Sequence, residues 1–256
     1  MFKYIWKKEI KAELFTWKGM VWFLISAILF SFTSYLLLTN KELSLLDQTE
    51  LLWLLGKVII GVGLLVAIID SSSIITSEFE KETVESIFLT PVAMKDFLLG
   101  KFLAVFTIWF FVFLISTPYI LVTSAGSHLA VPFISYVLLL GSLGVAGVTL
   151  IAFAVSLLYR SSKNTLTTVL IMFLVFTIPA LFASNLKNQG ISQIFSTINP
   201  IDNIFSSLDN VLVDYQLSLA QNFRFIAPLI IFGVVAFLFV IFAVRKFRKE
   251  GVVRND

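Results

Sequence analysis

The chain has 256 residues, of which 58% are apolar and only 14% are charged. An average soluble domain carries about 25% charged residues, and a soluble domain needs a polar exterior. Together with a mean hydropathy of +0.96, this composition excludes an ordinary soluble enzyme, a disordered segment and a nucleic-acid-binding domain. It indicates a polytopic membrane protein. A single His and no Cys argue against structural zinc, thiolate catalysis and a disulfide framework.

The apolar residues gather in six long runs. A bilayer core of about 30 Å requires roughly 20 apolar residues per helix, and each run is longer and less alternating than a barrel strand. We therefore predict an all-α membrane protein, a single transmembrane domain over residues 1–256. The predicted spans are Met20–Leu38, Leu51–Ile69, Phe102–Val122, Pro132–Leu158, Thr165–Ala183 and Phe225–Val244.

The basic residues predict the orientation of these spans. Of the 19 Lys and Arg residues, 15 fall before the first span, between the second and third, between the fourth and fifth, or after the sixth. Because cytoplasmic loops carry an excess of Lys and Arg, both termini should be cytoplasmic, and six spans agree with this parity. The absence of Cys suggests the plasma membrane of a prokaryote.

The first 19 residues predict an amphipathic helix. Phe2, Trp6, Ile10 and Trp17 share one arc of a helical wheel, and most of the lysines of this segment lie opposite. A helix of this kind lies in the plane of the membrane interface, with its aromatic side chains at the acyl boundary and its lysines near anionic headgroups. The alternative is a simple topology signal.

The segment 70–101 carries an unusual acidic stretch on the side where positive charge is expected. A short helix here places Val84, Ile87 and Phe88 on one apolar stripe, and Thr90-Pro91 should end it. Such a helix suits a groove on a partner protein, although a solvated connector fits the composition equally well. The glutamates of the stretch are Glu78, Glu80, Glu82 and Glu85.

This stretch resembles the signature of ABC transporter permease subunits of the type-2 exporter class. In that family an acidic run ends in a small-residue–Pro turn, and a Gly-Lys-apolar run then opens the third span, as Gly100-Lys101-Phe102 does here. The amphipathic start, the six spans and the long last outer stretch extend the resemblance over most of the chain. One departure is Glu82-Thr83, where the family usually has Gly-Thr, so the preceding turn is expected to be more helical.

The resemblance implies a permease that has no ATPase of its own. The segment around Glu80–Leu89 would be a cytoplasmic coupling helix, seated in a separate nucleotide-binding subunit that binds ATP and Mg²⁺. Two permeases, identical or homologous, and two ATPases would form the exporter. No catalytic, cofactor-binding or metal-binding residue is expected in this chain. The expected coupling residues are Glu78, Glu80, Glu82, Thr83, Glu85, Ile87, Phe88, Thr90 and Pro91.

The same residues also bear on other functions. The chain has no Gly-x-x-x-x-Gly-Lys-[Ser/Thr] loop for phosphates. The residues of an intramembrane protease are lacking. The sole His128 lies outside the spans, and an aspartyl protease needs two intramembrane acids, whereas Asp70 stands alone. A passive channel or a membrane-anchored assembly factor without ATP coupling stays open, and so does the substrate.

Four further features allow a structural or a functional interpretation. Asp70 is expected to be an interfacial acid with hydroxyl partners, and Lys57 is expected to extend outward to the interface, but either could take part in transport. Gly141, Gly144 and Gly147 should allow close helix packing. The outer stretch 184–224 should contain short re-entrant helices, with a surface cap as the alternative.

Overall fold

The computed structural model describes residues 2–39, 47–84, 92–182, 195–213 and 219–249. Every regular element within these ranges is a helix, as the composition predicts. Three of the helices are short: α1 and α10 have 13 residues each, and α4 has five. The helices are α1 (Phe2–Leu14), α2 (Trp17–Thr39), α3 (Gln48–Ile74), α4 (Thr76–Glu80), α6 (Met94–Thr123), α7 (Ala130–Tyr159), α8 (Ser162–Phe182), α10 (Pro200–Leu212) and α11 (Leu219–Lys249).

Six helices are long and apolar enough to cross a membrane: α2, α3 with its continuation α4, α6, α7, α8 and α11. They coincide with the six predicted spans, which confirms the all-α, six-span fold. Helices suit these sequences because a helix satisfies its own backbone hydrogen bonds where no water is available. Helices α6, α7 and α11 are longer than the predicted spans, because each continues beyond the predicted apolar run at one or both ends.

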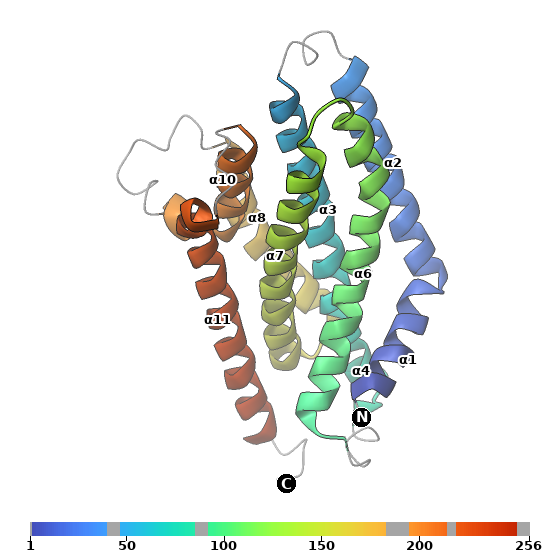
Figure 1. The fold of residues 1–256 in the computed structure, drawn as a ribbon. Coiled ribbons are helices and arrows are strands. Elements are labelled where there is room, and N and C mark those ends of the chain that lie inside the picture. Colours follow the sequence, from blue (N-terminus) through green and yellow to red (C-terminus); the bar gives the residue numbers. More distant parts are fainter. Residues whose placement is uncertain (1, 40–46, 85–91, 183–194, 214–218, 250–256) are drawn as a thin grey trace.

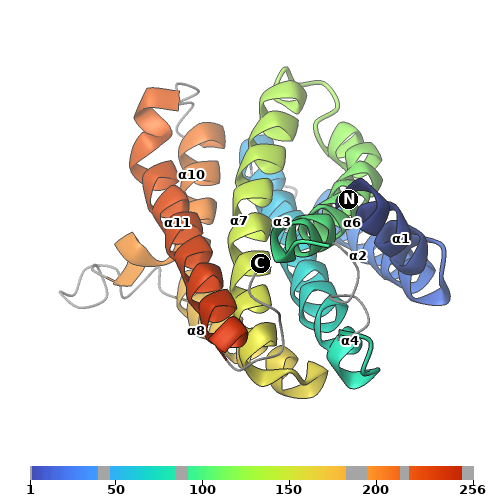
Figure 2. The same ribbon diagram turned by 90° about the horizontal axis from the view of Figure 1, so that it is seen from below.

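Helix α7 lies in the middle of the bundle. Helices α3 and α6 pack on one side of α7, and α8, α10 and α11 pack on the other (Figure 1, Figure 2). Helix α2 lies outside α3 and α6, and α1 lies against α6. The central helices α3 and α7 are the most buried of the spans, whereas α8 keeps most of its apolar side chains on the surface. Those exposed apolar faces suit a lipid environment.

One indole joins the three central helices. Trp109 of α6 is 1% exposed, and its ring fills the space that side chains at Gly63 of α3 and Gly141 of α7 would occupy. Its Nε1 donates a hydrogen bond of 3.1 Å to Ser142 Oγ. The glycines of α7 therefore serve close packing, as their spacing predicts, and Gly144 meets Ile204 in the same way.

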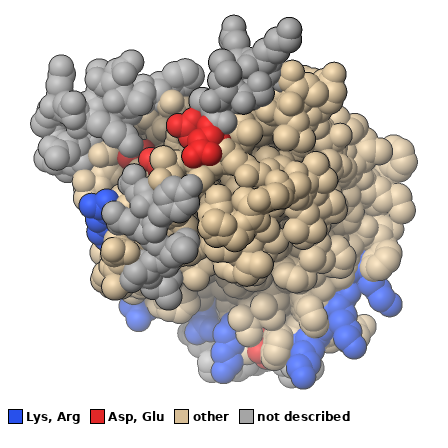
Figure 3. All heavy atoms as spheres, turned by 45° about the horizontal axis from the view of Figure 1, so that its top comes forward, with Lys and Arg blue, Asp and Glu red and all other residues tan. Residues whose placement is uncertain are grey.

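The two ends of the bundle differ in charge. Phe2 and Lys249, the first and last described residues, belong to helices that reach the same end (Figure 1). Most Lys and Arg side chains in Figure 3 gather along the lower edge, toward that end, and a broad uncharged area lies above them. We call this the basic end.

Helix α10 occupies the opposite end, within the stretch 184–224. The Asn199 side chain caps it by accepting hydrogen bonds from the backbone N–H of Ile201 and Asp202, at 3.0 and 3.4 Å. Most of its residues are buried against α3, α7, α8 and α11. The stretch therefore contains a short packed helix, and the last span begins at Leu219, earlier than predicted. Re-entrance into a membrane remains a prediction.

Candidate functional site: a short helix held by four neighbours

The acidic stretch begins on α4, a five-residue helix that follows α3 at the basic end. Three successive side chains of α4, Glu78, Phe79 and Glu80, contact different parts of the bundle. Glu78 faces α1 and α6, Phe79 faces α11, and Glu80 faces α8. The start of the expected coupling segment is therefore attached to elements far apart in the sequence.

Glu78 belongs to an ionic cluster around the buried Lys101. The Lys101 Nζ lies 2.9 Å from Glu9 Oε1 of α1 and 3.3 Å from Glu78 Oε1. It also donates a hydrogen bond of 2.6 Å to the carbonyl oxygen of Ile74, at the end of α3. Lys101 is 1% exposed, so these three oxygens replace the water that the ammonium group loses. We call Glu9, Glu78 and Lys101 the ionic cluster.

The sequence places α1 close enough for this cluster to form. A Cβ at Gly100 would lie 2.9 Å from the side chain of Ile5, so α1 crosses α6 where α6 has no side chain. Trp6 adds a hydrogen bond of 3.1 Å from its Nε1 to Thr107 Oγ1 of α6. The Gly-Lys pair that opens the third span thus has two roles, since the glycine admits α1 and the lysine binds it.

Glu80 caps the first turn of α8. Its Oε1 accepts a hydrogen bond of 2.7 Å from the Ser162 backbone N–H, and its Oε2 accepts one of 3.0 Å from Ser162 Oγ. A carboxylate at a helix N-terminus is favourable because it binds unpaired N–H groups and complements the helix dipole. Thr76 Oγ1 lies 2.6 Å from Ser162 Oγ, which adds a second link between α4 and α8.

Phe79 joins α4 to the last span. Its ring packs edge-on against Phe247 of α11, with 5.5 Å between the centroids. Phe247 is 1% exposed, and the guanidinium of Arg160, between α7 and α8, lies 5.2 Å from the same ring. This contact adds α11 to α1, α6 and α8 as a neighbour of α4.

The chain turns sharply after α4. Glu82 has φ = +55°, the left-handed conformation that glycine adopts most readily. The expectation of a more helical turn at Glu82-Thr83 is therefore wrong: the helix ends at Glu80, and the backbone takes the conformation suited to the family's glycine. Thr83 closes the turn, because its backbone N–H and its hydroxyl both donate hydrogen bonds to Glu78.

The predicted coupling residues that the structure describes, which are Glu78, Glu80, Glu82 and Thr83, have different surroundings. Glu78 and Glu80 hold α4 in place, and Thr83 shapes the turn, whereas the Glu82 side chain is exposed to solvent. The remaining predicted residues lie outside the described residues: Glu85, Ile87, Phe88, Thr90 and Pro91.

The expected N-terminal helix 1–19 is divided in the structure. Helix α1 ends at Leu14, and Trp17 instead opens α2, where it is 81% exposed. Phe2, Trp6 and Ile10 are partly buried rather than fully exposed. The apolar arc of α1 therefore packs at least partly on α6, and its position in the plane of a membrane remains a prediction.

Asp70 and Lys57 both have partners that the sequence interpretation missed. Asp70 is 1% exposed, and its Oδ1 pairs with Lys18 Nζ of α2 at 2.8 Å rather than with a hydroxyl group. The Lys57 Nζ lies 3.2 Å from the centre of the Trp53 ring and 5.3 Å from that of Phe205 of α10. Lys57 is therefore held by aromatic rings between α3 and α10.

Sequence reasoning also missed Glu9 and Ser162, which complete the attachment of α4. Glu9 is surrounded in the sequence by lysines, and the aromatic arc and the lysines alone decide the interpretation of the segment. The position of Glu9 was itself a signal. Glu9 lies one helical turn after Ile5 and Trp6, so a helix that buries those two residues also buries Glu9, and a buried carboxylate needs a cation as its partner. Ser162 carried no comparable signal.

The sequence model described as "ABC-2 family transporter protein" matches residues 4–252 of the chain. This match covers nearly the whole sequence, and the six apolar helices agree with it. The chain therefore belongs to the ABC-2 transporter family and is a multi-pass membrane component of a transport system. The comparison with curated proteins found no match.

Proposed function

We propose that this member of the ABC-2 family is the permease of an ATP-driven exporter, and that the segment beginning at α4 couples it to a separate ATPase subunit. The ATPase binds ATP and Mg²⁺, and this chain supplies the path across the plasma membrane. The basic end, with both termini, is then cytoplasmic. Two permease copies, or this chain and a homologous one, pair with two ATPases.

The observation that supports this proposal most directly is the attachment of α4 to α1, α6, α8 and α11. A force applied to the segment after α4 reaches four helices through named contacts: the ionic cluster, the Glu80–Ser162 hydrogen bonds and the Phe79–Phe247 ring pair. An element with several discrete contacts is suited to switch between two arrangements. A solvated connector has no need of such attachments.

The test is purification of the tagged full-length chain from its native host in mild detergent, followed by measurement of phosphate release from ATP. We expect an ATPase subunit in the assembly and ATP hydrolysis that depends on the permease. An assembly that lacks an ATPase and still transports in ATP-depleted vesicles would show a passive channel instead.

Charge reversal gives a sharper test of the site. Glu82→Lys with Glu85→Lys should reduce permease-dependent ATP hydrolysis at least about tenfold, because charges at an interface core are costly to mismatch. Membrane insertion should stay near that of the native chain. The control reverses two acids expected on the opposite side, Glu50→Lys with Asp214→Lys. An equal loss of hydrolysis in both pairs, or a parallel loss of insertion, refutes the coupling role.

A further inference from the structure

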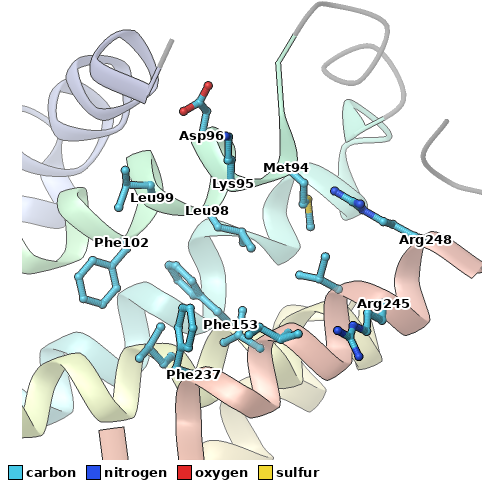
Figure 4. Close-up of a pocket in the computed structure, with 14 residues that line it drawn as sticks. Met94, Lys95, Asp96, Leu98, Leu99, Phe102, Phe153, Phe237, Arg245 and Arg248 are labelled. Atoms are coloured by element: carbon cyan, nitrogen blue, oxygen red, sulfur yellow. The ribbon is translucent and has the colours of Figure 1, made fainter. Parts of the chain in front are cut away.

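A large hollow lies between the start of α6 and the end of α11, at the basic end. Its volume is about 650 Å³, within the range of roughly 300–1,000 Å³ that is usual for small-molecule sites. The floor is apolar, and Figure 4 shows Phe102 of α6, Phe153 of α7 and Phe237 of α11 around it. It shares no lining residue with the contacts of α4.

The rim of this hollow is cationic on the side of α11. Arg245 and Arg248 are three residues apart on one helix, so they share a face. Both are exposed, and neither forms an ion pair with another described residue. Figure 4 shows Arg248 extending toward Met94, while the Asp96 carboxylate points away from the floor. An anionic group above the floor would therefore meet two guanidinium groups.

The hollow also lies at the level along the last span where a lipid headgroup meets its acyl chains. Its floor is formed by apolar residues of the last span, and its arginines follow directly where that span becomes basic. Guanidinium groups at the end of a span lie at the level of the lipid headgroups, where they attract anionic lipids. The geometry thus places a cationic rim at headgroup depth and an apolar floor at acyl-chain depth.

We propose that this hollow binds one anionic phospholipid of the leaflet on the basic side. Its phosphate lies at Arg245 and Arg248, and one acyl chain lies against Phe102, Phe153 and Phe237. A second copy of this chain is a poorer occupant, because its own basic end would repel the two arginines. The bound lipid joins α6 to α11, on whose buried side Phe247 contacts α4.

Helix α11 offers a matched test of the headgroup site. Arg245→Gln with Arg248→Gln removes the cations that line the hollow, whereas Lys246→Gln with Lys249→Gln removes the same charge from exposed residues of the same helix that do not line it. The measurement is native mass spectrometry of the delipidated protein titrated with phosphatidylglycerol or with phosphatidylethanolamine of the same acyl chains.

We expect one phosphatidylglycerol to bind in preference to phosphatidylethanolamine. The arginine pair variant should bind it at least about tenfold more weakly, since each cation near a headgroup contributes about a factor of five. The lysine pair variant should bind it like the native protein. An equal loss in both variants, or no preference for the anionic lipid, overturns the proposal.

A second pair of variants tests the acyl-chain site without changing charge. Ile241→Trp fills the hollow, and Leu238→Trp adds the same ring on the exposed face of α11, outside the lining. Lipid binding should fall only in Ile241→Trp. Unchanged binding in that variant overturns the proposal, and so does a change in oligomeric state instead of lipid retention, because the occupant would then be a second copy.

Discussion

The short helices at the two ends of the bundle are held by different forces. Helix α4, at the basic end, has five residues and is held by charged and aromatic contacts from a few side chains. Helix α10, at the other end, has 13 residues, of which 11 are buried. They include apolar residues such as Leu208 and also Asn210, which donates a hydrogen bond to Asn222 of α11. The loss of one partner of a buried ion pair is costly, whereas the stabilisation from apolar packing is proportional to the area buried. We therefore expect α4 to exchange its contacts more readily than α10.

The largest expected effect comes from the ionic cluster. Lys101→Met leaves the buried Glu9 without its cation, and it removes the nearer of the two cations of the half-buried Glu78, which keeps Lys8 at 3.8 Å. The loss of one partner of a buried pair costs about 3–5 kcal/mol. We expect that decrease in the free energy of unfolding in detergent micelles, together with loss of permease-dependent ATP hydrolysis. The exposed Lys95→Met, on the same helix, is the control.

A rescue variant separates the charge from the packing of the lysine stem. Glu9→Gln with Lys101→Met removes charge from both sides of the cluster, so part of the lost stability should return. If the double variant is as unstable as Lys101→Met, the cost lies in packing and the ionic account of α4 is wrong.

The next effect tests α10. Leu208 is fully buried and lies against Gly56 of α3, so Leu208→Ala leaves a cavity that costs roughly 3 kcal/mol. Thermal unfolding should show this loss, while ATP hydrolysis per folded molecule should stay unchanged, in contrast to Lys101→Met. Leu238→Ala, on the exposed face of α11, should have little effect. A drop in hydrolysis per folded Leu208→Ala molecule would erase the distinction between the two ends.

The smallest effect is a gain. Glu82→Gly places the residue best suited to φ = +55° in the turn after α4, and we expect the free energy of unfolding to rise by about 0.5–1 kcal/mol. Glu82→Ala keeps the strained backbone and removes only the charge, so it should not stabilise the protein. Equal stability of the Gly and Ala variants would show that the turn stores no strain.

The sequence alone predicts the spans and the position of the acidic segment, because apolar run length and local charge are visible in it. It does not predict the Glu9–Lys101 pair, whose members are 92 positions apart and meet only because α1 crosses α6 at Gly100. The turn at Glu82 was missed for another reason. Helix propensity favoured continuation, while the Thr83 hydrogen bonds to Glu78 outweigh the cost of a left-handed glutamate.

The indole of Trp109 has a consequence for how such a bundle can open. The ring packs against the backbone of α3 at Gly63 and of α7 at Gly141. If α3, α6 and α7 slid past one another, the ring would collide with the side chains or the backbone of the neighbouring turns. We therefore expect these three helices to move together. If a passage opens, we expect it to involve movement of α8, α10 and α11 relative to these three helices.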